Sequence, residues 1–468
     1  MPPHDVPTWS FSESCELSSF RIIPTLAQIR IFVRHTRMSA PLQPITIRGR
    51  YLWQGDKRFV VRGVVYQDNT LGRQPYDPIV DEELPGLRHD VTLFKELGIN
   101  TILVYNINPS KPHAQAMKLL EEAGIYVLAC VYLNAKGISR HDPYGSYNAE
   151  NVQSYFRTID VMASFPNTLG MFVAQRLINS MMNDASCVAC TLVIAAVVKD
   201  LKRYMNLRHK VAGQRILPVA YGGDNDGFRD KQVFEYLRTR EESERIDFWT
   251  FTKYTWETSQ SEMSSNLTTN FTHTNIPIFL SEYSDEPSPP NNSPQTNPTR
   301  PSNATTTLLS PSSPTHQILS GGCLYEFTRG PGNDYGLVRH LPHDETQYPG
   351  LPGGALRQAL ETERQNAAEQ RTTDQGVILI TQDFMTYKEK LEETRGGGEI
   401  NQVEEGVEGV EGEGPTETIS HPNPSSTPPM TMREQSEETN NVFSISGQVP
   451  SSCIHWESER LRIESNEE

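Results

Sequence analysis

The stretch Phe94-Lys-Glu-Leu-Gly-Ile-Asn-Thr-Ile-Leu-Val-Tyr105 joins two kinds of pattern within a few residues. Its first residues close a segment, Leu87–Leu97, in which apolar side chains recur at steps of three and four, as on one face of a helix. Its last residues form a short apolar run, Thr101–Tyr105, which is typical of a strand buried on both faces. A helix followed at once by such a strand is the repeating unit of α/β folds with a parallel sheet.

The same unit recurs along the chain. Further helical patterns cover Ala114–Ala123, Val152–Ala163 and Thr191–Tyr204. The strand-like runs are Phe59–Tyr66, Thr101–Tyr105, Tyr126–Val131, Leu169–Val173, Leu217–Tyr221, Phe248–Tyr254, Ile276–Glu282 and Gly322–Phe327. Eight strands alternating with helices over about 300 residues favour an α/β fold of the (β/α)8 TIM-barrel type over an open doubly wound sheet.

Composition divides the rest of the chain. Residues 1–44 are predicted to be unstructured, and residues 45–395 are predicted to form the barrel domain. Within that domain, the polar stretches 284–314 and 342–374 are predicted to be disordered insertions, because they carry too few apolar residues to pack. Residues 396–468 are rich in Gly and Glu and then in Pro, Ser and Thr, which predicts a disordered acidic tail.

The net charge of -16 arises mainly in this tail. From Gly396 onward there are 15 Asp and Glu residues against 3 Lys and Arg residues. The folded part is therefore close to neutral. Binding to nucleic acid requires a concentrated basic face, so the sequence argues against it.

The six cysteines do not indicate a metal site. Cys187 and Cys190 form the one CxxC pair, but no second pair and no nearby histidine completes a set of zinc ligands. A structural role is therefore expected for both, and no metal or cofactor is expected. Apolar runs long enough to cross a bilayer are also missing from the sequence.

In a barrel of this type the chemistry gathers at the carboxyl ends of the strands. Aromatic and amide side chains around a single carboxylate suit a sugar ring, which offers apolar faces for stacking and hydroxyls for hydrogen bonds. For any one tyrosine, capping the barrel core is an equally good explanation. The strand-end residues are Tyr66, Gln67, Tyr105, Ala129, Gln175, Arg176, Tyr221, Tyr254, Glu282, Tyr283 and Tyr325.

Glu282 is the most informative of these residues. It ends the apolar run Ile276-Pro-Ile-Phe-Leu-Ser-Glu-Tyr283 abruptly with a carboxylate. A charge at the end of a buried strand must be paired, solvated or functional. A catalytic role is the favoured interpretation, and a structural salt bridge is the alternative.

Several motifs, in this order and spacing, resemble those of the fungal β-1,3-glucanosyltransferases of glycoside hydrolase family 72. Proteins of that family remodel cell-wall glucan and are often anchored by glycosylphosphatidylinositol. The resemblance covers roughly residues 45–338. The motifs are Val61-Arg-Gly-Val-Val-Tyr-Gln67, Phe94–Tyr105, Ala123-Gly-Ile-Tyr126, Phe279-Leu-Ser-Glu-Tyr283 and Tyr335-Gly-Leu-Val338.

The resemblance implies roles for particular residues. Glu282 falls at the position of the family's nucleophile, whereas the position of its acid/base Glu is occupied by Arg176. Two sugar-site residues of the family also differ, because an Arg is replaced by Leu103 and an Asp by Ala129. The residues expected to contact substrate are Gln67, Tyr105, Gln175, Tyr221, Tyr254 and Tyr325.

The implied reaction is retaining cleavage of a β-1,3-glucan and transfer of the new reducing end to a second glucan. Arginine stays protonated and cannot serve as the acid or the base. The sequence therefore predicts that this reaction is impaired. Three readings remain: a working transferase, a catalytically dead glucan-binding or scaffold protein, and an intracellular interaction protein that acts through its acidic tail.

The location of the protein is also open at this point. The resemblance implies the cell surface or the cell wall, with a glycosylphosphatidylinositol anchor by family only. Residues 1–44 contain no recognisable signal peptide, which leaves the cytoplasm as the alternative. Passage through the secretory route is favoured by the candidate glycosylation sites Asn266, Asn270, Asn291 and Asn303.

Overall fold

A computed structural model describes most of the chain from residue 42 onward. The described residues are 42–67, 76–133, 136–224, 228–254, 271, 273–285, 300, 302–330, 335–343, 354–395 and 444–465. The chain divides into two units, residues 1–40 and 41–468, and all described residues belong to the second.

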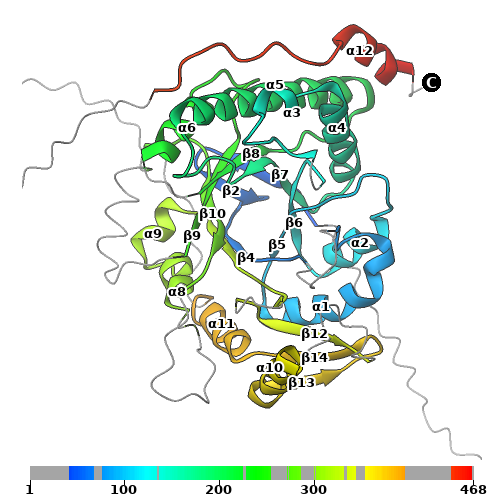
Figure 1. Cartoon of the computed structure of the whole chain (residues 1–468), viewed down its shortest axis with the longest axis vertical. Helices are drawn as coiled ribbons and strands as arrows, with labels where there is room; N and C mark the ends of the chain where they lie inside the picture. The colour runs from blue at the N-terminus through cyan, green and yellow to red at the C-terminus, as the bar shows by residue number, and fades with distance from the viewer. Residues whose placement is uncertain are drawn as a thin grey trace, which may run out of the picture. The chain divides into compact units, whose positions relative to one another are not determined.

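Eight parallel strands close into a barrel, which confirms the predicted fold class (Figure 1). Going round the barrel, the order is β10-β11-β4-β5-β6-β7-β8-β9, so strands that follow one another in the chain are neighbours. The strands are β4 (Val61–Val65), β5 (Thr101–Val104), β6 (Tyr126–Cys130), β7 (Thr168–Gln175), β8 (Val219–Gly223), β9 (Phe248–Lys253), β10 (Ile278–Tyr283) and β11 (Gly321–Leu324).

The apolar runs of the sequence are explained by burial on both faces of each strand. On β4, the side chains of Val61 and Val65 join the cluster inside the barrel, whereas Val64 joins the cluster between the strands and the helices. On β5, Leu103 points inward and Ile102 outward in the same way. Because successive side chains of a strand point to opposite faces, both the odd and the even positions must be apolar.

The four helices expected from the sequence are present. They are α1 (Leu84–Leu97), α2 (Ala114–Glu122), α4 (Ala149–Ala163) and α5 (Asp184–Ala212), and they lie outside the ring of strands (Figure 1). Further short helices are η1 (Asp81–Glu83), α3 (Pro143–Ser146) and α6 (Phe228–Arg238). The amino end of α5 is capped by Asn183, whose side chain accepts a hydrogen bond from the Ser186 amide at 2.8 Å.

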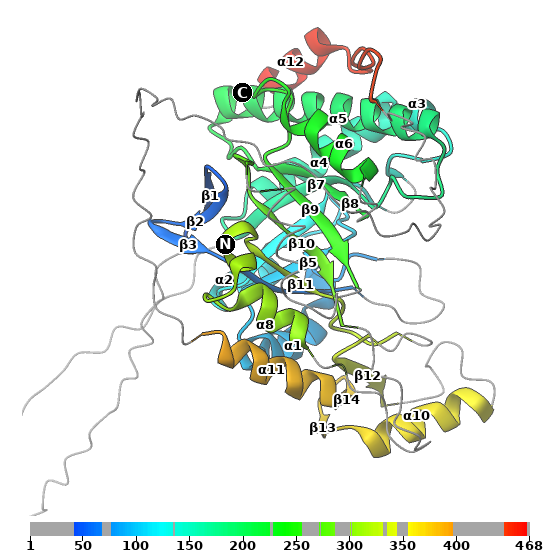
Figure 2. The same cartoon turned by 90° about the vertical axis from the view of Figure 1, so that its left-hand side faces the viewer.

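A small antiparallel sheet covers the amino-terminal end of the barrel (Figure 2). It consists of β1 (Ile45–Arg48), β2 (Tyr51–Gln54) and β3 (Lys57–Phe59). Its apolar side chains Ile45, Leu52 and Phe59 belong to the cluster inside the barrel. The Phe59 ring packs edge-on against Tyr126 at the start of β6, with 5.1 Å between the ring centroids.

The prediction of disorder is wrong for part of each polar insertion. Residues 302–314 include α8 (Asn303–Leu309) and lead into α9 (Pro314–Ile318), and the side chains of Leu308 and Leu309 are buried. Two apolar side chains on one helical face were enough for packing, although the composition around them is polar. Residues 286–299 and 301 lie outside the described residues.

The second insertion is also largely folded where it is described. Strands β12 (Val338–Pro342), β13 (Glu369–Thr372) and β14 (Gly376–Ile380) form an antiparallel sheet in the order β12-β14-β13. Helix α10 (Gly354–Asn366) precedes β13, and α11 (Gln382–Glu393) follows β14. Residues 344–353 lie outside the described residues.

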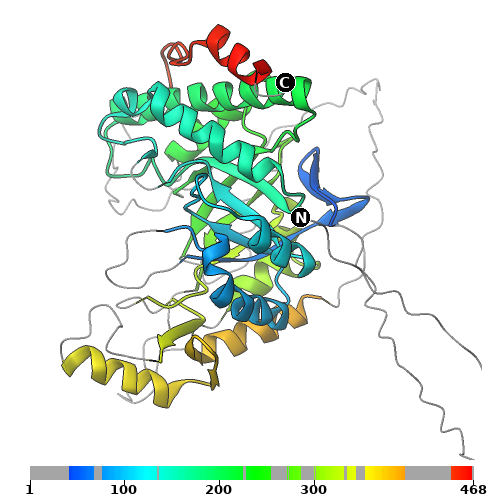
Figure 3. The same cartoon turned by 90° about the vertical axis from the view of Figure 1, so that its right-hand side faces the viewer.

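Residues 444–465 lie on the barrel, which corrects the prediction of disorder for them. Helix α12 (Trp456–Ser465) packs against α5 (Figures 2 and 3). Ile454 and Ile463 are buried, and the Arg203 guanidinium lies 4.3 Å from the centre of the Trp456 ring. Apolar burial and a cation–π contact therefore stabilise the docked helix. The rest of the tail, residues 396–443, lies outside the described residues.

Replacing Ile463 by alanine is expected to release α12 from α5. Ile463 is 1% exposed, and removal of a buried branched side chain costs about 2–5 kcal/mol. That cost is large for a docked helix of 10 residues. Limited proteolysis with mass spectrometry should show faster cleavage within residues 444–465, and the thermal midpoint of the barrel should not change. The matched control is Leu461→Ala on the same helix, because Leu461 is 60% exposed. Equal cleavage of the two variants would contradict the packing of α12.

Candidate active site

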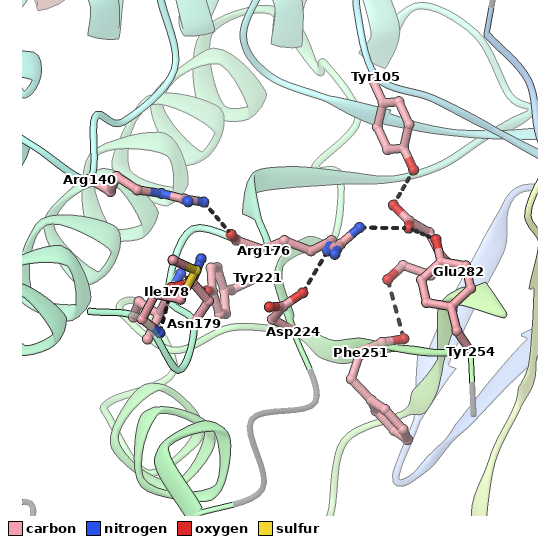
Figure 4. Close-up of polar contacts among 12 residues, drawn as sticks. Tyr105, Arg140, Arg176, Ile178, Asn179, Tyr221, Asp224, Phe251, Tyr254 and Glu282 are labelled. Carbon is pink, nitrogen blue, oxygen red and sulfur yellow. Dashed lines mark hydrogen bonds and ion pairs between the residues drawn. The ribbon is translucent and has the colours of Figure 1, made fainter. Parts of the chain in front are cut away.

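Glu282 lies near the end of β10, at the carboxyl-terminal end of the barrel, and its side chain is 4% exposed. Both of its oxygens accept hydrogen bonds from tyrosine hydroxyls (Figure 4). Tyr105, which follows β5, donates to Oε1, and Tyr254, which follows β9, donates to Oε2. We call the region of Tyr105, Arg176, Tyr254, Glu282 and Tyr325 the barrel mouth.

The hydroxyls of Tyr105 and Tyr254 are expected to donate hydrogen bonds to Glu282 permanently. Burial, followed by the charge of Glu282, raises the pKa of the Tyr105 hydroxyl well above its usual value. The same two causes, in the same order, raise the pKa of Tyr254. Both hydroxyls therefore keep their protons at neutral pH and hold the carboxylate of Glu282 in one orientation.

Arg176 follows β7 and bridges two carboxylates. Its Nη1 lies 3.4 Å from Glu282 Oε2, and its Nε lies 2.6 Å from Asp224 Oδ1 (Figure 4). Burial alone would lower the pKa of Arg176, but the hydrogen bond to Asp224 and the charge of Glu282 outweigh burial and raise that pKa. The guanidinium is therefore a fixed positive charge at the barrel mouth, and it cannot donate a proton to a leaving group.

The backbone of Arg176 is held as firmly as its side chain. Its φ angle of 48° lies in the left-handed region, which is uncommon for residues other than glycine. Its amide donates to the carbonyl of Gly222 at 2.8 Å, and its carbonyl accepts from Arg140 Nη2 at 2.8 Å. The position of Arg176 is thus determined by the ends of β7 and β8 and by Arg140.

Three tyrosine rings form an aromatic cluster beside Glu282. Tyr254, Tyr325 and Tyr335 pack edge to face, with centroid separations of 5.7 Å, 5.8 Å and 5.9 Å. All three side chains are partly exposed. Such rings can stack on the apolar face of a sugar while their hydroxyls form directed hydrogen bonds.

A buried arginine supports this cluster from behind. Arg300 Nη1 donates to the carbonyl of Tyr325 at 2.8 Å, and Nη2 donates to the carbonyl of Tyr335. Its Nε pairs with Asp383 Oδ2 on α11 at 2.8 Å. Because Arg300 is 2% exposed, it joins α11 to the two tyrosine-bearing segments within the core.

The amide side chains expected at the site are engaged with protein groups. Gln67 Nε2 donates to Glu326 Oε2 at 2.7 Å. Gln175 Nε2 lies 3.4 Å from Cys130 Sγ. Both residues follow the inward-facing positions of their strands, so the structure brings them towards the barrel mouth.

Other strand-end residues point away from the mouth. Tyr66, Ala129, Tyr221 and Tyr283 all belong to the cluster between strands and helices. Tyr221 is fully buried, and its hydroxyl accepts a hydrogen bond from the Ile178 amide at 3.0 Å. The structure therefore gives Tyr221 a supporting position behind Arg176, and it places Ala129 outside the mouth.

The sequence interpretation missed several residues around the mouth. Tyr335 was visible only as the first residue of the motif Tyr335-Gly-Leu-Val338, and Arg300 lies at the edge of a polar insertion. No periodic pattern marks either residue, because their positions depend on contacts between distant segments. Glu326, which is fully buried beside Gln67, was likewise not singled out.

The remaining sequence candidates lie elsewhere. Asn303 is exposed at the start of α8, whereas Asn266, Asn270 and Asn291 lie outside the described residues. Cys187 and Cys190 are buried on α5 within the core. In the described part of the chain, no group of three or more His, Cys, Asp or Glu side chains could hold a metal ion. None of the helices in this part of the chain has the length and hydropathy needed to cross a membrane.

Comparison with known proteins connects this arrangement to a family. The model of the family described as Glucanosyltransferase matches residues 34–349. The chain is 33% identical over 321 residues to 1,3-beta-glucanosyltransferase gel1 of Aspergillus fumigatus, covering 68% of this chain and 65% of that protein. It is 32% identical over 301 residues to 1,3-beta-glucanosyltransferase GAS5 of Saccharomyces cerevisiae, covering 63% and 58%. The chain thus spans less than two thirds of the length of these relatives.

Solved structures share the fold. Saccharomyces cerevisiae Gas2p in complex with laminaritriose and laminaritetraose matches with a TM-score of 0.59 at 23% sequence identity, over 76% of this chain and 70% of that chain. A second structure of the same protein, in complex with compound 9, matches with a TM-score of 0.60 at 24% identity. At this level of identity the likeness concerns the fold alone.

Proposed function

Because the chain belongs to the glucanosyltransferase family, we propose that its barrel mouth binds a β-1,3-glucan and that it transfers this glucan poorly or not at all. The proposal that transfer is poor or absent rests on the ion pair between Arg176 and Glu282. In the proposed reaction Glu282 would be the nucleophile. The side chain beside Glu282 carries a guanidinium group, although the proposed reaction requires a second carboxyl group there.

Binding of glucan is supported by the chemistry of the mouth and by the relatives. Tyr254, Tyr325 and Tyr335 offer ring faces and hydroxyls next to a buried carboxylate. A related fold, Gas2p, has been solved with laminari-oligosaccharides. Since rings and hydroxyls are what a glucose unit requires for recognition, a β-1,3-linked oligosaccharide is the proposed ligand.

The catalytic impairment follows from the two steps of a retaining mechanism. Two carboxyl groups about 5–5.5 Å apart are needed, one to attack the anomeric carbon and one to protonate the leaving oxygen. The second group must then remove a proton from the incoming acceptor sugar. Arg176 can do neither, because its guanidinium keeps its protons in both steps.

Asp224 is an imperfect substitute for the missing group. Its Oδ1 lies 2.6 Å from Arg176 Nε, so a fixed cation occupies the side of the carboxylate that faces Glu282. The guanidinium of Arg176 thus stands between Asp224 and Glu282, and it keeps the two carboxylates from facing each other. We therefore assign Asp224 to the electrostatic pairing of Arg176.

Incubation of the full chain with reduced laminari-oligosaccharides should show binding without the rapid formation of longer products. Loss of a positioned acid/base lowers a rate by about 10²–10⁴, so products should accumulate more slowly by that factor than with gel1 assayed in parallel. Calorimetry would measure binding, and anion-exchange chromatography would measure products.

The Glu282→Gln variant serves as the control for this assay. It should bind the oligosaccharides but lose whatever slow transfer the unmodified chain retains. Rapid transfer that Glu282→Gln abolishes would refute the impairment. An absence of oligosaccharide binding would refute the proposed ligand.

We further propose the cell wall as the place of action, since the relatives are by name transferases of 1,3-beta-glucan. The exposed position of Asn303 on α8 is compatible with glycosylation in the secretory pathway.

A further inference from the structure

A concave site lies at the opposite end of the barrel from Glu282. It is a cavity of about 600 Å³ between the small sheet β1–β3 and the amino-terminal ends of β4, β5 and β6. Figure 2 shows this sheet at the end of the barrel where the strand arrows begin. We call this space the basal cavity.

The basal cavity carries a strong positive charge. Lys57, Arg58, Arg62 and Arg395 all line it. Asp56 is the one carboxylate among its described lining residues, and the side chain of Asp56 is 99% exposed and pairs with Arg48 at 3.3 Å. Among the described lining residues, Asp56 therefore does not compensate the arginines of the cavity.

The hydrogen bonds of the arginines confirm this imbalance. Arg58 Nη2 donates to the carbonyls of His316 at 2.6 Å and Leu319 at 3.2 Å. Arg62 Nη2 donates to the carbonyl of Thr394 at 2.8 Å, and Arg395 Nη2 donates to the carbonyl of Gly98 at 2.9 Å. Within the described part of the chain, none of these three arginines forms an ion pair with a carboxylate. Neutral acceptors orient the guanidinium groups without cancelling their charge.

Burial makes this concentration of charge costly. Burial is the largest cause that lowers the pKa of Arg58 and of Arg62. The like charge of Arg50 lowers the pKa of Arg58 further, and that of Arg395 lowers the pKa of Arg62 further. Clefts that are lined by charge of one sign raise the local concentration of the opposite ion. A bound anion would relieve both the burial and the repulsion.

Two buried nitrogens of the cavity lining also lack hydrogen-bond partners among the described residues. They are Arg58 Nε and His316 Nδ1. His316 is 8% exposed, and burial, with Arg58 and Arg62, lowers its pKa to about 4. Its ring is therefore neutral at pH 7 and can offer one N–H group as a donor.

We propose that the basal cavity binds a small phosphate ester. Guanidinium groups match the oxygens of phosphate in a two-pronged geometry, and several such groups around one cavity favour an anion with more than one negative charge. The volume lies within the range of about 300–1,000 Å³ that is typical of sites for metabolites. The site is separate from the glucan site, because one lies at each end of the barrel.

Titration of the full chain with sodium pyrophosphate, at constant ionic strength, tests the proposal. Calorimetry should show saturable binding, and the thermal midpoint should rise as pyrophosphate is added. The variants Lys57→Met and Arg395→Met should each weaken binding about tenfold, since each removes one charge-assisted contact. Both side chains are exposed, so these variants are expected to fold.

The matched control is Lys231→Met, which removes an exposed positive charge from α6, away from the cavity. It should leave the affinity for pyrophosphate unchanged, and none of the three variants should alter binding of laminari-oligosaccharides. No saturable binding at millimolar pyrophosphate, or an equal loss in Lys231→Met, would overturn the proposal.

Two further arms identify the source of the anion. The six glutamates between residues 399 and 413 follow Arg395 closely in the chain. The first experiment replaces all six glutamates by glutamine. If only this variant binds pyrophosphate, the chain's own acidic segment fills the cavity, and the proposal is overturned. The second experiment measures sedimentation of the chain with phosphatidylcholine vesicles that contain a phosphoinositide. Binding to these vesicles without binding to free pyrophosphate would also overturn the proposal.

Discussion

The Arg176→Glu variant is expected to elongate reduced laminari-oligosaccharides about 10²–10⁴ times faster than the unmodified chain. The substitution would place a carboxyl group beside Glu282, where the guanidinium now lies 3.4 Å from Oε2. Glutamate is shorter than arginine, so the new carboxyl group would lie farther from Glu282 than this guanidinium does, yet close enough for two negative charges to repel. The pKa of one carboxyl group is therefore raised, and that group can act as the acid. The rate of appearance of longer products, followed by chromatography, gives the measurement.

Two companion variants separate this effect from simple loss of the ion pair. Arg176→Gln removes the positive charge without supplying an acid, and it should remain as slow as the unmodified chain. The double variant Arg176→Glu with Glu282→Gln should lose all of the gain, because the nucleophile is gone. If Arg176→Gln were as fast as Arg176→Glu, the ion pair itself, and not the missing acid/base, would be the cause of the impairment.

The Arg300→Met variant is expected to lower the free energy of unfolding by about 3–5 kcal/mol. Removal of the guanidinium leaves Asp383 as an uncompensated charge, in a pair whose side chains are 3% and 10% exposed. It also removes donors from the carbonyls of Tyr325 and Tyr335. Urea unfolding, followed by tryptophan fluorescence, would measure the change.

A surface pair provides the comparison. Arg371 contacts Glu369 at 2.6 Å and Glu96 at 2.8 Å through side chains that are 25% to 41% exposed, so Arg371→Met should cost no more than about 1 kcal/mol for each pair. The double variant Arg300→Met with Asp383→Leu should recover part of the loss, because it no longer leaves a buried charge unpaired. Equal costs for Arg300→Met and Arg371→Met would contradict the role given to Arg300.

The architecture of the barrel could be predicted because its strands are buried on both faces. Each of the eight apolar runs became a barrel strand, and all four helical patterns became helices. Composition was a weaker guide to disorder. Helix α8 and the sheet β12–β14 fold within polar stretches, since a few apolar side chains on one face suffice when a neighbouring surface is available.

The sequence indicates which strand ends carry candidate site residues, but not which way their side chains point. Tyr105, Tyr254 and Arg176 do surround Glu282, but Tyr221 and Ala129 point outward. Successive side chains of a strand point to opposite faces, but this rule would have separated the inward-pointing from the outward-pointing residues only in a regular sheet. The register shifts between Leu280 and Glu282 on β10, and again between Phe172 and Ala174 on β7. Such irregularities re-aim side chains and leave no mark in the sequence.

The aromatic support of the site was out of reach for a different reason. Arg300 and Asp383 meet across 83 residues of chain, and Tyr335 reaches Tyr254 from beyond the last barrel strand. Contacts of this kind depend on the closed fold as a whole. A single sequence supplies the residues but not the pairing.

The hydrogen bonds at Glu282 bear on how the protein would behave in a changing environment. A binding site that depends on a histidine would change its charge between about pH 5 and 8. Here the three donors to Glu282 are Tyr105, Tyr254 and Arg176, and the pKa of each is raised above its ordinary value. None of them releases its proton below about pH 10. The polar frame of the mouth is thus insensitive to alkalinity up to about pH 10.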